Sequence, residues 1–398
     1  MRKAVSNWYN GQDAMTLATV VAKCKQQSGW SHKDLLKLSH TKPANDGVSL
    51  VCKYIMKGWK EIKTEYADKE NPEEVLKVLS YLEVVDKIKH SSDETEVITM
   101  IEEHALEREH LLTSHLKSRN VWRALLKEMP LRLLMKRLGK MTAKKILDPG
   151  STETQTVCDR IQNEVILKKA RIHPFTILVA LENYKKGQGY KGKTKWETEG
   201  NIIDAMDAAF YKSLTGGDSA EYLEPVDKNL VIAVDISTSL SSVVPGTSLS
   251  TAVAAAAITM SFSSTEANTQ VLAYSSGALI PCSVAAGMTL EQVTAEMIKT
   301  PSDCTDCTLP MAWATENEKA VDVFIILTNN PIWPFSASPV EALKKHRQKM
   351  GIFSKFVMCG LTSTGHAIAD TPDRGVLSIC GFDLGAITLI QNMAHSMI

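Results

Sequence analysis

The 398-residue sequence has no long hydrophobic run, no disulfide framework and no net charge. No apolar stretch approaches the roughly 20 residues that a membrane-spanning helix needs, and the N-terminus, MRKAVSNWYNGQDAM, lacks the apolar core of a signal peptide. We therefore expect an intracellular protein, in the cytoplasm first and the nucleus second, with no membrane partner. The eight cysteines are scattered, as in a reduced protein. Cys304 and Cys307 form a CxxC pair without the further ligands of a zinc site or the context of a redox motif, which favours packing or loop cysteines.

A change in charge divides the chain near residue 228. Residues 1–228 carry a balance of +5, and residues 229–398 carry a balance of −5. The hydrophobic pattern changes at the same place, and the length also favours two domains. The sequence therefore predicts a helical-repeat domain over 1–228 and an α/β domain over 229–398.

Helical periodicity dominates the first domain. Asn71 and Pro72 are predicted to start a helix in which apolar residues from Val75 to Val85 recur on one face. Ser31 and Asp34 have the spacing of a capping box. Successive helices with short breaks and no strand pattern predict a helical, HEAT-like solenoid. The other helices are predicted over 12–27, 47–66, 94–117, 119–138, 154–169, 174–186 and 201–213.

Two basic stretches of the first domain have the charge density that contact with phosphates requires. Residues 111–145 hold ten basic side chains and one acid, Glu128. Residues 184–196, YKKGQGYKGKTKW, combine five lysines with three aromatics, which suit stacking on unpaired bases. A solvated helix face and a flexible loop explain the same patterns, and the residues alone leave both interpretations open. The RNA-binding candidates in the first stretch are Lys117, Arg119, Arg123, Lys136, Arg137 and Lys140.

A smaller group consists of Lys33, Lys37 and His40. Spacings of four and three residues place these side chains on one helix face. The other side is predicted to hold Leu35, Leu36 and Leu38. From the residues alone, a solvated amphipathic helix is the preferred interpretation.

After residue 229 strands alternate with helices, which predicts a doubly wound, mostly parallel sheet. Strands are predicted over 230–235, 270–274, 322–328 and 354–359, and helices over 248–263, 289–298, 339–350 and 384–396. Ligands of such sheets lie beyond the carboxyl ends of the strands. The stretch VIAVDISTSL places Asp235, Ser237 and Ser239 at that end.

These three residues form a D-x-S-x-S motif, which is typical of von Willebrand factor A domains and predicts a site for a hard divalent cation. Such a cation prefers oxygen ligands and keeps some of its waters, so two hydroxyls and a carboxylate suit it. Thr305 is predicted to add a hydroxyl. A domains typically carry an aspartate at the third loop, where this sequence has Asn329. The lost negative charge predicts weak cation binding. Mg²⁺ is the expected ion.

Two alternatives stand beside the metal site. The serines can cap a helix in an ordinary turn, although an apolar strand that runs into D-x-S-x-S is a fairly specific context. A phosphatase-type nucleophile at Asp235 needs a second carboxylate two residues later, where Ser237 stands instead.

Both halves of the sequence resemble the Ro ribonucleoprotein family, which joins a ring of helical repeats, the TROVE domain, to a von Willebrand A-like domain. The matching stretches run from residue 2 to the C-terminus and include GWSHKDLLKLSH, CKYIMKGWKE, HLLTSHLKS, LLKKARIHPF, DAAFYK, AVDISTS, TDCTLPM and PDRGVLSICGFDLGA. Relative to the family, the chain is expected to lack several N-terminal helices that help to close the ring.

The resemblance implies an RNA-binding protein of small noncoding ribonucleoproteins. In the family, Y RNAs bind the outer basic surface of the ring, and the 3′ ends of misfolded RNAs enter its central hole, which implies a role in RNA quality control. By motif match, His40 falls on a position that contacts Y RNA, with Lys33 and Lys37 beside it. The family's metal positions match Asp235, Ser237, Ser239 and Thr305.

No residues form a suitable nucleophile–base pair, so we expect no enzymatic activity. Two other functions are left open. One is a protein-interaction module, in which the A-like domain binds an acidic partner through the cation and the helices serve as a scaffold. The other is a non-functional truncated paralogue, for which an exposed apolar edge and poor solubility are expected.

Overall fold

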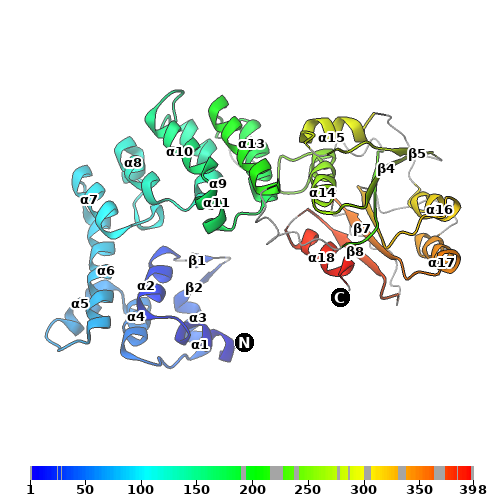
Figure 1. The fold of residues 1–398 in the computed structure, drawn as a ribbon. Helices are drawn as coiled ribbons and strands as arrows, with labels where there is room; N and C mark the ends of the chain where they lie inside the picture. Colours follow the sequence, from blue (N-terminus) through cyan, green and yellow to red (C-terminus); the bar gives the residue numbers. More distant parts are fainter. Residues whose placement is uncertain are drawn as a thin grey trace. The chain divides into compact units, whose positions relative to one another are not determined.

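The computed structural model divides into two compact units, residues 1–130 and 131–398 (Figure 1). This division differs from the predicted boundary between residues 228 and 229, which stays a prediction. No helix in the described part of the chain is long and apolar enough to cross a membrane. The structure describes residues 2–24, 26–27, 29–189, 194–215, 227–236, 242–275, 278–285, 287–299, 306–329, 338–362, 373–382 and 384–395.

The first unit consists of packed helices and one short antiparallel pair of strands. Helix α2 packs against α4 and α6, α1 against α3, and α7 against α8. The elements are α1 (Arg2–Asn10), α2 (Ala14–Lys23), β1 (Gln26–Gln27), β2 (Trp30–Ser31), α3 (His32–Ser39), α4 (Asp46–Lys57), α5 (Trp59–Tyr66), α6 (Glu73–His90), α7 (Glu94–His104), the 3₁₀ helices η1 (Arg108–His110) and η2 (His115–Lys117), and α8 (Arg119–Glu128).

Local sequence explains where several of these helices begin and end. The capping box of Ser31 and Asp34 is confirmed at the start of α3. The prediction for Asn71 was wrong: its side-chain amide donates to the carbonyls of Tyr66 and Lys69, and Pro72 is the N-cap residue of α6. The predicted helix over 47–66 is divided at Gly58, whose φ of 88° belongs to the left-handed region that favours glycine.

Pro130 divides the predicted helix over 119–138 into α8 and α9, because proline lacks the N–H that a helix interior needs.

The helices of the second unit pack as neighbours, with α13 against α10 and α12, and α9 against α12. They are α9 (Leu131–Ala143), α10 (Thr152–Gln162), α11 (Glu164–Ala170), α12 (Pro174–Lys185) and α13 (Gly200–Thr215).

A six-stranded mixed sheet follows in the second unit, in the order β5-β4-β3-β6-β7-β8. All neighbouring pairs are parallel except β4 with the edge strand β5. The predicted doubly wound, mostly parallel sheet is confirmed. The strands are β3 (Leu230–Asp235), β4 (Thr269–Ser275), β5 (Ala278–Pro281), β6 (Val323–Thr328), β7 (Lys355–Gly360) and β8 (Val376–Cys380).

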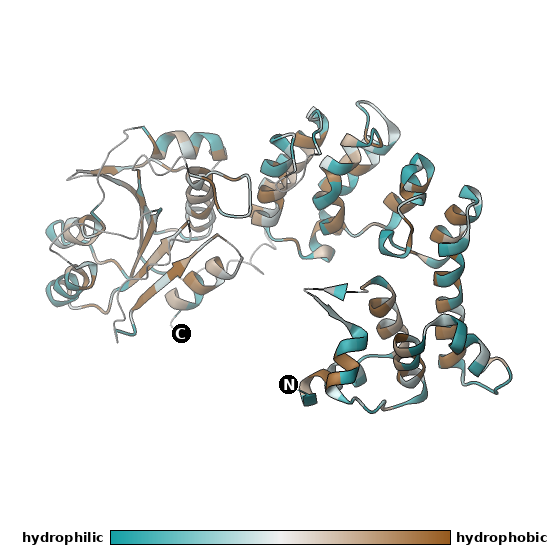
Figure 2. Ribbon diagram, turned by 180° about the vertical axis from the view of Figure 1, so that it is seen from behind, coloured by the Kyte–Doolittle hydropathy of each residue, from teal (hydrophilic) through white to brown (hydrophobic). Residues whose placement is uncertain are grey.

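Helices cover both faces of this sheet, so its central strands β3 and β6 are buried along their whole length. Helix α14 contacts β4, and α18 contacts β7 and β8 on the same face, while α16 and α17 lie on the other (Figure 1). The strands are accordingly hydrophobic in Figure 2. The helices are α14 (Thr251–Thr265), α15 (Leu290–Met297), α16 (Leu309–Glu316), α17 (Pro339–Met350) and α18 (Leu384–Ala394).

Alternate side chains of the central strands form the core beneath α16 and α17. This cluster includes Val231 and Ala233 of β3, Tyr274 of β4, and Phe324 and Ile326 of β6. Burying each of the larger apolar side chains, such as Val231, Phe324 and Ile326, contributes roughly 1.5–3 kcal/mol. Asp235 continues the alternation of Val231 and Ala233, so the core side chains of β3 end in a carboxylate.

Candidate functional sites

Helix α3 presents Lys33, Lys37 and His40 to solvent, as the spacing predicted. Asp34 lies between the two lysines and accepts hydrogen bonds from the Ser31 N–H (3.0 Å) and Oγ (2.6 Å). These bonds, followed by the charges of Lys37 and Lys33, lower the pKa of the Asp34 carboxyl below its usual value. The face is therefore basic with one fixed acid in its first turn.

His40 ends α3 in a left-handed conformation, with φ 52° and ψ 40°. Its N–H donates to the carbonyl of Leu36 at 3.0 Å. Helices commonly end in this conformation, but glycine is the residue that adopts it without strain. The prediction that Leu38 lies on the buried side was wrong, because Leu38 is 55% exposed, whereas Leu36 is buried.

Two rows of exposed basic side chains run along α8 and α9, one in each unit. Arg119, Arg123 and Lys127 recur every four residues of α8. On α9, Arg132, Lys136 and Lys140 recur with the same spacing and are also exposed. Residues four apart share a helix face, so each row is continuous. Of the other candidates, Lys117 is exposed in η2, and Arg137 is half-buried on α9.

The two rows differ in their acidic neighbours. Lys127 forms an ion pair with Glu102 of α7 at 2.7 Å, and Arg123 donates to the Asn120 side chain at 3.2 Å. Within the described residues, Arg132 and Lys136 form no ion pair. Arg132 and Lys136 of α9 are thus more available for an anionic partner than Lys127 of α8.

Two of the three aromatics in residues 184–196, Tyr184 and Trp196, have structural roles. Tyr184 is buried, and its hydroxyl accepts from the Glu199 N–H at 3.2 Å. Trp196 stacks on Tyr184 and donates from Nε1 to the Tyr184 carbonyl at 3.0 Å. A Cβ on Gly139 would come within 2.4 Å of the Trp196 ring. The lysines near Tyr184 and Trp196 in the sequence therefore did not indicate a stacking role for these two rings. The third aromatic, Tyr190, lies outside the described residues.

Asp235 lies at the carboxyl end of β3, where the strand order reverses between β4 and β6. This switch point is where open α/β sheets bind ligands. The carboxylate is fully buried and accepts a hydrogen bond from Thr328 Oγ1 of β6 at 2.7 Å. The structure thus confirms the strand and its terminal carboxylate, while Ser237, Ser239 and Thr305 lie outside the described residues.

Two further oxygen-bearing side chains lie next to elements of the second unit, Asn329 after β6 and Asp306 before α16. Asn329 comes directly after β6 and is buried, and its Nδ2 donates to Thr251 Oγ1 of α14 at 2.7 Å. Asp306 accepts from both the N–H (2.9 Å) and Oγ1 (2.7 Å) of Thr308. The amide of Asn329 therefore points its donor group toward α14, a contact that the sequence did not predict.

Cys307 is a packing residue, as predicted. It is buried in the core cluster, and Tyr274 Oη lies 3.4 Å from its Sγ. Burial, together with the charges of Asp235 and Asp306, raises the pKa of the Cys307 thiol to about 12. Burial and the same Asp235 charge also raise the pKa of Tyr274. A thiol held this strongly in its protonated form does not suit metal or redox chemistry.

The described donor set fits only a weak cation site. No group of three or more histidine, cysteine, aspartate or glutamate side chains that could hold a metal occurs among the described residues. Asp235 supplies one buried carboxylate, and hard cations are bound more weakly as the number of charged ligands falls. The metal residues predicted from the sequence therefore stay a prediction.

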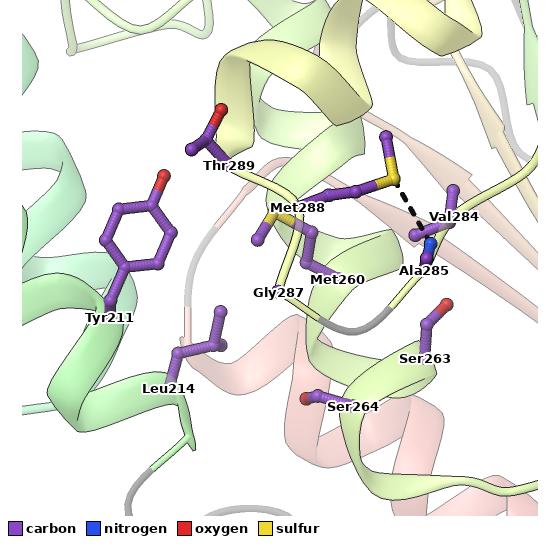
Figure 3. A pocket seen from close by; sticks show the side chains of 10 residues that line it. All are labelled: Tyr211, Leu214, Met260, Ser263, Ser264, Val284, Ala285, Gly287, Met288 and Thr289. Carbon is purple, nitrogen blue, oxygen red and sulfur yellow. Dashed lines mark hydrogen bonds between the residues drawn. The ribbon is translucent and has the colours of Figure 1, made fainter.

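A cavity of about 340 Å³ lies between α13, α14 and the loop before α15 (Figure 3). Tyr211 and Leu214 of α13 face Met260 of α14 and Met288 of the loop. Tyr211 Oη accepts from the Leu290 N–H at 2.7 Å, which ties α13 to α15. Among the described residues the lining is mainly apolar and includes no charged side chain, so these residues do not suit a phosphate or a metal ion.

The fold and these sites define a helical-repeat protein with a von Willebrand A-like domain. The model of the TROVE domain matches residues 1–185, and the model of the Ro60 vWA domain matches residues 229–394. The chain belongs to the Ro60 family of TROVE-domain proteins.

Similar proteins cover both domains. RNA-binding protein RO60 of Caenorhabditis elegans is 32% identical over 433 residues, which include 100% of this chain and 66% of the relative. RNA-binding protein RO60 of Deinococcus radiodurans is 29% identical over 399 residues, with 99% of this chain and 71% of the relative covered. The crystal structure of the Deinococcus radiodurans RO (RSR) protein superposes with a TM-score of 0.83 at 28% identity, covering 100% of this chain and 77% of that chain. The chain thus spans about two thirds of the length of the worm relative.

Proposed function

We propose that the chain binds small noncoding RNA, specifically Y RNA and the unpaired ends of misfolded small RNAs, and that it acts without catalysis. The observation that carries this proposal is the exposed basic row of α9, whose Arg132 and Lys136 form no ion pair within the described residues. Two similar proteins bear the name RNA-binding protein, which supports the same class of partner.

The geometry of the rows suits a nucleic-acid backbone. Side chains four residues apart recur about every 6 Å along a helix, so one row can contact several phosphates in turn. Phosphate contacts supply affinity without sequence information, whereas unpaired bases and RNA shape supply selectivity. In this proposal the basic rows of α8 and α9 provide affinity, and the α3 face with His40 provides selectivity.

A gel-shift competition tests the selectivity. A Y-like hairpin RNA with an unpaired 3′ end is compared with a blunt RNA duplex of equal phosphate number. We expect the Y-like RNA to displace the duplex at lower concentration. Equal competition by the two RNAs would contradict the proposed selectivity, and no binding by either would contradict RNA binding itself.

We also propose a weak Mg²⁺ site at the carboxyl end of β3. Asp235 would supply the charge, with the hydroxyls of Ser237, Ser239 and Thr305 and the carbonyl of Asn329 as neutral ligands. The support is the buried carboxylate at the switch point of the sheet. A cation held by these residues would supply a positive charge to which an acidic side chain of a protein partner could bind. The cytoplasmic compartment stays a prediction.

A further inference from the structure

Helix α1 holds an exposed aromatic ring beside the start of α3. Trp8 is 41% exposed, and its indole stacks on the imidazole of His32, with centroids 6.1 Å apart and planes inclined by 22°. Tyr9 meets the indole edge-on, with centroids 5.0 Å apart. His32 stacks on one face of the indole, and a large part of Trp8 is still exposed to solvent.

The ring is held on a rigid support. Tyr9 is fully buried, and its Oη lies 2.7 Å from Nδ1 of His32, which fixes the imidazole under Trp8. Ser6 Oγ of α1 also lies 3.1 Å from Thr41 Oγ1, just beyond α3. Burial lowers the pKa of His32, so the imidazole is neutral at neutral pH. A preorganised ring loses little conformational entropy when a ligand stacks on it.

Exposed cationic side chains lie on the same two helices, α1 and α3. Lys33 directly follows His32, Lys37 lies one helical turn further along α3, and both are exposed. Arg2 and Lys3 are exposed on α1 itself. An exposed aromatic ring on helices that also carry exposed lysines and arginines suits an unpaired base together with its phosphates.

We propose that Trp8 is a stacking platform for one unpaired base, and that Lys33 and Lys37 contact the phosphates beside that base. This inference rests on the proposed RNA binding and adds to it a residue that the sequence patterns did not identify. It also places the recognition of an unpaired base on the surface formed by α1 and α3.

The test compares Trp8→Leu with Trp8→Phe, because leucine keeps apolar bulk without a π face and phenylalanine keeps the π face. The probe is a hairpin RNA with an unpaired 3′ extension. We expect Trp8→Leu to weaken binding by about 10-fold, since stacking one base on an aromatic has that order of effect. Trp8→Phe should lose much less, and the salt dependence should be unchanged in both, because stacking carries no charge.

Abasic substitutions in the same RNA identify the base. At one unpaired position, removing the base should weaken binding to the parent protein and abolish the difference between the parent and Trp8→Leu. Equal affinities of Trp8→Leu and the parent for the intact RNA would overturn the inference while RNA binding stands. An equal loss on a blunt duplex would also overturn it, because that result indicates altered packing. If the parent binds no RNA, both the proposed function and this inference fail.

Discussion

Replacing Arg132 and Lys136 together with glutamine removes two charges of the α9 row while keeping polar side chains with good helix propensity. Each phosphate that a cation neutralises contributes about 0.7–0.9 to the slope of log affinity against log salt. If each residue contacts one phosphate, the slope should flatten by roughly 1.4–1.8 units. At 0.1 M salt the same relation gives a loss of about 6-fold for each contact, or roughly 40-fold for both.

The assay is filter binding of a Y-like RNA between about 0.05 and 0.3 M salt, a range in which the screening of exposed charges changes strongly. Both side chains are exposed, so the free energy of unfolding should change by about 0.5 kcal/mol or less. Lys127→Gln is the matched control, because Lys127 already pairs with Glu102 and must leave that pair to reach a phosphate. We expect its slope to change by less than that of either α9 residue. A double variant with the parental slope would refute the reasoning and leave the row as a solvated helix face.

Three further predictions concern His40, His173 and Asn329. His40→Gly should raise the free energy of unfolding, measured by denaturant unfolding, by about 0.5–1 kcal/mol, since glycine adopts the φ of 52° without strain. The same variant should bind Y RNA more weakly in a gel shift. An unchanged affinity would contradict the proposed RNA contact of His40. His173 is the N-cap residue of α12, and burial lowers its pKa to about 4. Between about pH 6.5 and pH 4 the unfolded chain binds a proton at this histidine and the folded protein does not. The free energy of unfolding should therefore fall by at most roughly 3 kcal/mol as the pH is lowered through this range. His173→Asn keeps a capping acceptor without this titration, so denaturant unfolding should show a flatter pH profile, and an equally steep profile argues against His173. Asn329→Asp should enlarge the rise in melting temperature on adding millimolar Mg²⁺, whereas an equally large rise in the parent contradicts a weak site.

The sequence predicted those features that depend on residues close together in the chain. The apolar run before Asp235 predicted β3 and its carboxylate, and the spacing of Ser31 and Asp34 predicted the start of α3. Strand β5 was missed because it has four residues, ends in Pro281 and lies at the edge of the sheet, where alternation is too short to recognise. Helix α16 was missed for a similar reason, since its eight residues are apolar on several sides.

Contacts between distant residues could not be predicted from spacing. Trp196 appeared to belong to a basic RNA-binding loop, but it packs on Gly139 and Tyr184. Trp8 showed no pattern of its own, because its neighbour His32 lies 24 residues further along the chain. The role of an aromatic side chain depends on its tertiary contacts. The local sequence therefore indicated Trp196 as a stacking residue and gave no indication of Trp8.

The salt dependence of RNA binding by the unmodified chain tests the central claim most directly. If exposed basic rows contact at least four phosphates, log affinity for a Y-like RNA should fall with log salt with a slope of about −3 or steeper. A slope near zero, or affinity no greater than that of an unrelated neutral protein, would contradict RNA binding by these surfaces.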